Sequence, residues 1–196
     1  MESTINVIAV MVGVSGFVLG VWEYAKAQRW KKAELAAQKL DLLHTDPLLR
    51  LCCVLLDYSE RRLPVPPGYA GIARDETFVH STDRMMEGLK PETEKASFEW
   101  PLVVYRDAFD RIFCYLEEIN HYLDTGLLVV GDVRPLRYWV EQAANPRFLE
   151  EKDVPARFVA EYGYKSVPML ARKLGVKWPE VSRDSARSVK VPAPAG

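Results

Sequence analysis

One long apolar run near the start of the chain, Ile5 to Tyr24, constrains the fold most strongly. Up to Glu23, Asn6 and Ser15 are its only clearly polar members. A helix that rises about 1.5 Å per residue needs about 20 residues to cross a hydrocarbon core about 30 Å thick. The run has about that length, so the sequence predicts that residues 1–24 form a single transmembrane anchor.

The charges on the two sides of the run predict its orientation. Only Glu2 is charged before it, whereas four Lys or Arg residues lie between Lys26 and Lys32. Basic residues close to a span stay on the cytoplasmic side. We therefore expect a single-pass protein of the cell membrane, with its N-terminus outside and its C-terminal domain in the cytosol. The residues expected to contact lipid headgroups are Trp22, Lys26, Arg29, Lys31 and Lys32.

A cleaved signal peptide is the alternative interpretation of this run. Ala25, Lys26 and Ala27 fit the small-x-small pattern of a cleavage site. However, no basic residue precedes the run, the run is longer than a typical signal-peptide core, and bulky Trp22 and Tyr24 stand just before the cut. These features favour an anchor that is retained.

Small residues recur on one face of the predicted span. They step by four, three and four positions and include a GxxxG pattern: Ala9, Gly13, Gly16 and Gly20. In lipid, small residues let two helix backbones approach closely, and such packing drives the association of spans. Glycine is also frequent in membrane spans in general, which is the alternative explanation of this pattern. Four small residues on one face nevertheless favour self-association. The sequence thus predicts a homo-oligomer.

The remainder of the chain predicts helices almost throughout. Residues 25–45 are strong helix formers without Gly or Pro, and we expect them to continue the anchor as a juxtamembrane helical stalk. Residues 46–175 predict a cytosolic helical domain, and residues 176–196 predict a disordered tail. Because no stretch alternates apolar and polar residues for long, strands should be few or absent. The expected fold class is all-α, with a helical bundle in the cytosol.

The clearest amphipathic helix of the domain follows residue 100. Its predicted buried face contains Leu102, Tyr105, Phe109, Ile112, Leu116, Ile119 and Leu123. On the other side, Arg106 with Asp110 and Asp107 with Arg111 have the i,i+4 spacing of exposed ion pairs.

Helix starts can also be read from capping residues. Asp46 followed by Pro47 predicts the first turn of a helix. Further helices are expected at about 75–89, 133–143, 146–151, 155–162 and 168–174.

Composition limits the possible ligands. With 26 basic and 27 acidic residues the net charge is −1, which gives no field to attract nucleic acid. Cys52, Cys53 and Cys114 form no CxxC pair, so we expect small buried hydrophobes rather than a disulfide, a zinc site or a catalytic thiolate. The chain contains no nucleotide-binding glycine loop and no HExxH motif, and no cofactor or metal is expected. A protein partner for the helical domain is compatible with this composition.

One short pattern carries a resemblance to a known family. Arg74 and His80, with Asp75 directly after the arginine, fit the R-x(4–6)-H pattern of HEPN ribonucleases. That family consists of small all-α proteins, and the resemblance implies a dimer in which the Arg binds phosphate and the His assists attack by the ribose 2′-OH. The motif follows a Pro/Gly loop instead of lying in the strongest helix. The overall plan also resembles membrane-anchored HEPN-like accessory proteins of bacterial antiviral systems, some of which form membrane pores without nuclease activity.

Two functions follow from these observations. The favoured one is a membrane-tethered, self-associating helical protein that acts without catalysis in bacterial defence, as a scaffold or as an effector that forms or gates a membrane pore. The alternative is a membrane-anchored HEPN-type ribonuclease whose catalytic residues are Arg74 and His80. The first function is supported by the anchor and its small-residue face, and the second by one short motif.

The predicted topology can be tested with a reporter fused after Gly196. We expect the reporter to show cytosolic activity, because the basic residues from Lys26 to Lys32 do not readily cross a membrane. Activity on the outer side, or a mature protein that begins after Ala27, would contradict a retained anchor with this orientation.

Overall fold

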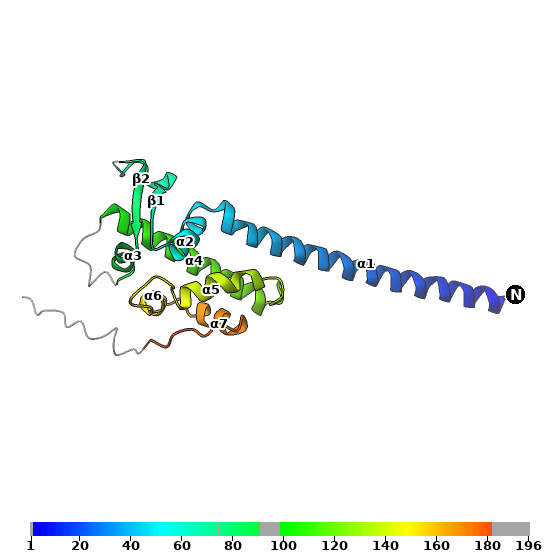
Figure 1. Ribbon diagram of the computed structural model, residues 1–196. Coiled ribbons are helices and arrows are strands. Elements are labelled where there is room, and N and C mark those ends of the chain that lie inside the picture. The colour runs from blue at the N-terminus through cyan, green and yellow to red at the C-terminus, as the bar shows by residue number, and fades with distance from the viewer. Residues whose placement is uncertain (1, 74, 91–98, 182–196) are drawn as a thin grey trace, which may run out of the picture. The chain divides into compact units, whose positions relative to one another are not determined.

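A computed structural model describes residues 2–73, 75–90 and 99–181, without the side chains of residues 2–10 and 12. This part of the chain is mostly helical, as predicted (Figure 1). It divides into two compact units, Met1–Lys39 and Leu40–Gly196. We describe each by itself and call the second the helical domain.

The first unit belongs to a single unbroken helix, α1, which runs from Glu2 to Thr45. The predicted helical stalk, residues 25–45, is therefore part of one helix with the apolar run. Within the described residues, no helix combines the length and the apolarity that crossing a bilayer requires.

The helical domain begins with the last turn of α1 and with helix α2, Pro47–Asp57. The predicted cap is confirmed: a carboxylate oxygen of Asp46 accepts hydrogen bonds from Leu48 N at 3.0 Å and from Leu49 N at 3.1 Å. Pro47 occupies the first turn, where an N–H would have no partner within the helix.

A small antiparallel hairpin follows, formed by β1, Glu60–Pro64, and β2, Thr77–Ser81. The short 3-10 helix η1, Pro67–Tyr69, lies between the two strands, and helix α3, Thr82–Leu89, follows β2. The prediction of one helix over residues 75–89 is therefore wrong in its first half. Phe78 and His80 point inward and Thr77 and Val79 outward, which is the alternation of a strand with one buried face.

Helix α4, Trp100–Asp124, forms the centre of the domain and packs against α2, α3 and α7 (Figure 1). Six of the seven residues of the predicted face are buried, and Leu123 is half-buried. Val104, Ala108 and Tyr115 are buried as well, so the buried surface extends well beyond one stripe. Helix α3 approaches the start of α4 closely at Gly88. A Cβ added at this glycine would stand 3.0 Å from the Cβ of Tyr105 in α4.

The C-terminal part contains η3, Arg134–Leu136, and helices α5, Arg137–Ala144, α6, Val154–Tyr162, and α7, Ser166–Lys173. The helix expected over residues 146–151 is absent from this described segment, which forms turns. Part of the predicted tail packs on the domain: the Trp178 ring lies edge-on to Phe113, with centroids 6.5 Å apart. Residues 182–196 lie outside the described part.

Candidate functional site

The apolar surface of α1 is the first candidate site. Eight large apolar side chains between Met11 and Tyr24 are exposed on the helix, and Phe17 keeps 73% of its surface. They cover most of the circumference of the helix, since consecutive residues are turned by about 100°, and the remaining side carries Gly13, Gly16 and Gly20. Such a surface is unfavourable in water, at roughly 25 cal/mol per Å² of apolar area.

The small-residue face of this segment is open. A Cβ added at Gly13, Gly16 or Gly20 would meet no other atom within 4 Å. The fourth predicted member of the face, Ala9, has its side chain outside the described part. Larger residues therefore fit at the three glycines of the isolated helix, and any restriction there must come from something that packs against α1.

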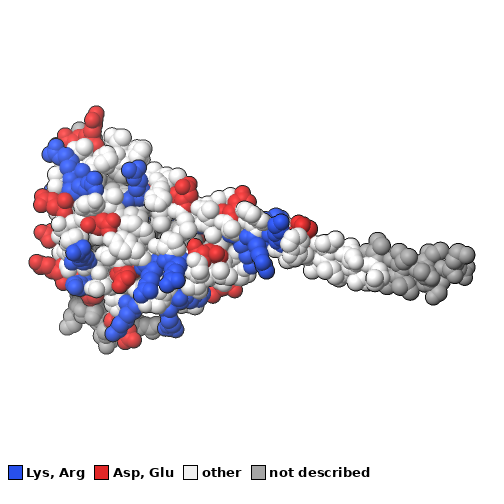
Figure 2. All heavy atoms as spheres, turned by 45° about the vertical axis from the view of Figure 1, so that its right-hand side comes forward, with Lys and Arg blue, Asp and Glu red and all other residues white. Residues whose placement is uncertain are grey.

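The basic flank follows directly along the helix. Lys26 places its ammonium group 5.1 Å from the centre of the Trp22 ring. Arg29, Lys31 and Lys32 are exposed. Figure 2 shows blue Lys and Arg side chains on α1 and, further along the helix, a white stretch without them. The predicted headgroup-contacting residues are thus on the surface, as that role requires.

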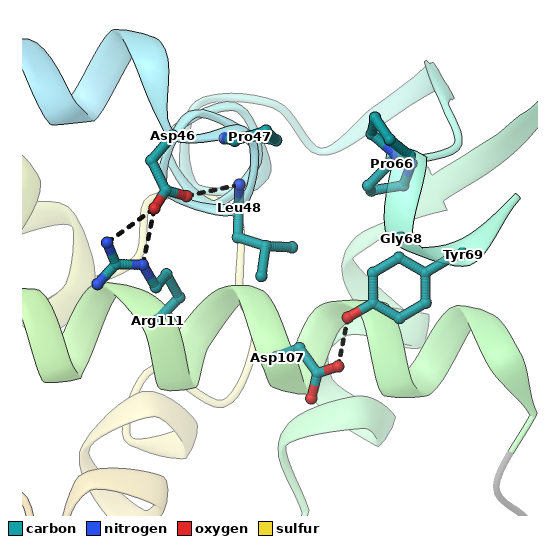
Figure 3. Close-up of a pocket in the computed structure, with 9 residues that line it drawn as sticks. Asp46, Pro47, Leu48, Pro66, Gly68, Tyr69, Asp107 and Arg111 are labelled. Carbon is teal, nitrogen blue, oxygen red and sulfur yellow. Dashed lines mark hydrogen bonds and ion pairs between the residues drawn. The ribbon is translucent and has the colours of Figure 1, made fainter.

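The second candidate site is a polar junction at the start of α2. The Arg111 guanidinium of α4 donates from Nε to the Asp46 carboxylate at 2.8 Å, and its second nitrogen lies 2.7 Å from the same oxygen (Figure 3). Burial raises the pKa of Asp46, but the hydrogen bonds from Leu49 N and Arg111 outweigh it and hold that pKa below 3.8. The carboxylate is therefore ionised at neutral pH and ties the end of α1 to α4.

An open groove of about 590 Å³ lies beside this junction. The Tyr69 hydroxyl of η1 donates to the Asp107 carboxylate of α4 on its wall (Figure 3). Burial and the neighbouring carboxylate both raise the pKa of Tyr69, which keeps it protonated. Both carboxylates of the groove thus have partners: Asp46 binds Arg111, and Asp107 binds Tyr69. These contacts hold the start of α2, η1 and α4 together.

The acidic residues of α4 correct a sequence prediction. Asp107 does not pair with Arg111 on a solvated face, since Arg111 binds Asp46 and Asp107 accepts from Tyr69. Asp110 accepts a hydrogen bond of 2.7 Å from the Tyr164 hydroxyl. Arg106 is 8% exposed and donates to the Lys90 carbonyl at 3.2 Å. Local spacing suggested i,i+4 pairs, whereas these groups bind residues distant in sequence.

The proposed catalytic pair of the ribonuclease alternative is only partly visible. Arg74 lies outside the described residues. His80 is fully buried: its Nε2 lies 2.8 Å from the Tyr58 carbonyl and its Nδ1 3.2 Å from the Tyr105 hydroxyl. A carbonyl only accepts, so Nε2 carries the proton and Nδ1 accepts from Tyr105. Both ring nitrogens are occupied, and no side of the ring is open to a phosphodiester.

Electrostatics agree with a structural role for this histidine. Burial lowers the pKa of His80 below 6.5, despite hydrogen bonds to the backbone that favour the charged form. Burial also raises the pKa of Tyr105 to about 12, so the phenol stays protonated and can donate. The pair links β2 to α4.

Burial separates two of the three cysteines from the third. Cys52 and Cys53 are buried as predicted, and burial raises the pKa of both thiols, that of Cys53 to about 12. Cys114 is exposed, contrary to the prediction, because it lies off the buried surface of α4. In the described part of the chain, no three His, Cys, Asp or Glu residues are grouped so as to hold a metal ion.

Comparison with protein-family models, with curated proteins and with solved structures finds no match to this chain. Function must therefore be argued from the residues. No local pattern indicates the Asp46–Arg111 and Tyr69–Asp107 contacts, which join residues 65 and 38 positions apart. The exposed apolar residues of the loop after α4 were missed too, although an aliphatic stretch between Gly126 and Gly131 is visible in the sequence.

The buried state of His80 predicts a pH-dependent stability. Because its pKa is lower in the folded protein, its contribution is complete above the unfolded pKa of about 6.5 and is lost as the pH falls below that value. Between pH 7.5 and 5.5, wild type should lose up to about 1.4 kcal/mol of unfolding free energy per pH unit more than His80→Gln, measured by denaturant unfolding in detergent.

His121→Gln is the matched control, because it makes the same substitution at an exposed histidine. If His80→Gln folds with the stability and pH dependence of wild type but abolishes an RNA cleavage that wild type shows, then His80 is catalytic and its structural role is wrong.

Proposed function

We propose that this protein is a single-pass membrane protein whose anchor is the apolar first half of α1. The observation that supports this most strongly is the exposure of the large apolar side chains from Met11 to Tyr24. At about 1.5–3 kcal/mol for each such side chain buried, transfer of all eight into lipid is worth on the order of 10 kcal/mol. No described part of the chain covers them, since all eight remain exposed in the folded chain.

The proposed orientation rests on the asymmetry of charge. Lys26, Arg29, Lys31 and Lys32 follow the apolar segment, and Glu2 alone precedes it. The helical domain then lies in the cytosol and the N-terminus outside. The four basic residues and Trp22 contact anionic headgroups at the cytosolic surface.

We propose further that the anchors associate through the face that carries Gly13, Gly16 and Gly20. The supporting observation is that nothing fills the space beside these glycines within the chain. A second copy of α1 can approach closely there, and van der Waals contact between backbones then stabilises a homo-oligomer in lipid.

The helical domain acts in this proposal as a non-enzymatic scaffold or effector. Its acidic groups at the α2–α4 junction bind Arg111 and Tyr69, its buried histidine links two elements, and two of its thiols are protonated. These polar groups serve packing. A role in bacterial defence, in which the assembled spans form or gate a pore, extends the proposal and rests on the combination of anchor and helical domain.

The proposed association can be tested with substitutions in the anchor. Gly13→Leu or Gly16→Leu should raise the dissociation constant of the oligomer by about tenfold or more, because a leucine side chain separates the helix axes. The helix itself accommodates leucine at both sites, and leucine favours insertion at least as much as glycine. The measurement is the oligomer mass in detergent as a function of protein concentration.

Val18→Leu is the matched control, since Val18 is exposed on the side of the helix opposite the three glycines and the substitution stays apolar. Its oligomer mass should equal that of wild type. An unchanged oligomer in both glycine variants would mean that the helical domain, and not the anchor, holds the subunits together.

A further inference from the structure

The loop after α4 exposes aliphatic side chains. Leu127, Val129 and Val130, which we call the apolar tip, are 45%, 56% and 43% exposed. They stand between Gly126 and Gly131, at the end of α4 that lies away from the hairpin. Three neighbouring aliphatic residues on a surface loop have no role in the core.

The loop holds the apolar tip in a fixed conformation. Leu128, in the middle of the run, is 1% exposed and anchors the loop, and its N–H donates to the Tyr122 carbonyl at 3.1 Å. Val129 N donates to the Asp132 carboxylate at 2.9 Å, and Asp132 N donates back to the Val129 carbonyl at 2.9 Å. Binding through the apolar tip therefore does not require the conformational entropy of a mobile loop to be lost.

The charges around the apolar tip favour an anionic surface. Of the two acidic groups beside it, Asp124 is paired with Lys173, and Asp132 accepts a hydrogen bond from Val129 N. Arg134 and Arg137, which follow the loop, are exposed, and among the described residues no ion pair joins either one to an acidic group. An apolar tip with free arginines nearby is complementary to aliphatic chains beneath anionic headgroups.

We infer that the apolar tip inserts into the headgroup region of the membrane that holds the anchor, as a second membrane contact of this chain. The inference rests on the proposed membrane function. The proposed anchor tethers the helical domain to the same bilayer, because both belong to one chain.

Lipid suits the tip better than a protein partner does. Three small aliphatic side chains cannot supply the roughly 1,000 Å² that a stable protein interface requires. A tethered domain needs much less, because its anchor already keeps it at high effective concentration beside the bilayer. A modest apolar insertion then suffices to orient the domain.

The test uses the full chain in vesicles of phosphatidylcholine and phosphatidylglycerol that contain brominated acyl chains. Single cysteines, each carrying an environment-sensitive fluorophore, are placed in a Cys114→Ser background, since the buried Cys52 and Cys53 have protonated thiols. Val129→Cys reports on the tip and Phe17→Cys on the anchor. Val79→Cys is the matched control, because Val79 is a valine 42% exposed on β2, near the opposite end of α4.

We expect the brominated lipids to quench the fluorophores at positions 17 and 129 and not the one at 79. In a second variant, Leu127→Ser with Val130→Ser should reduce quenching at 129 while quenching at 17 and the unfolding temperature remain as before. Quenching at 17 without quenching at 129 would overturn the inference and leave the anchor intact. Protection of 129 from an aqueous quencher without lipid quenching would identify a protein contact and overturn it too. No quenching at 17 would refute the proposed anchor itself.

Discussion

Burial of α4 is the constraint on which the helical domain depends. Its residues are buried well beyond one stripe, so α2, α3 and α7 must all pack around it. Polar contacts then fix these elements in register: Asp110 binds Tyr164, and Glu117 accepts from Ser166 N at 3.1 Å. Each joins α4 to a segment about 50 residues later in the chain. The apolar surface supplies the stability, and the carboxylates supply the specificity of packing.

Helix α1 exposes its large apolar residues instead of burying them. The domain buries its apolar residues within the chain, whereas α1 exposes Phe17 and other large apolar residues over most of its circumference. A helix that is apolar all round is stable only where its surroundings are apolar. We propose that lipid supplies these surroundings, that the glycine face adds a second copy, and that the apolar tip adds a second contact with the same membrane. All three proposals place this chain at a membrane.

Much of the domain could be predicted because its signals are local. The spacing of Tyr105 and Phe109 shows a helix face, and Asp46 before Pro47 marks a helix start. The hairpin escaped prediction because its strands have five residues each and stand among prolines, where alternation is too short to detect. The partner of Arg111 could not be predicted either. Spacing within one helix indicates neighbours on that helix only, and Asp46 lies 65 residues earlier in the chain.

Alkaline extraction of membranes from cells that express the full chain tests the central claim most directly. A spanning helix resists this treatment, and a surface-bound protein is released. The account predicts that wild type stays in the membrane pellet. Val18→Lys should shift part of the protein to the soluble fraction, because a lysine near the middle of a span costs about 2.5–3.5 kcal/mol. Complete release of the wild-type chain would contradict the assignment of α1 as a membrane anchor.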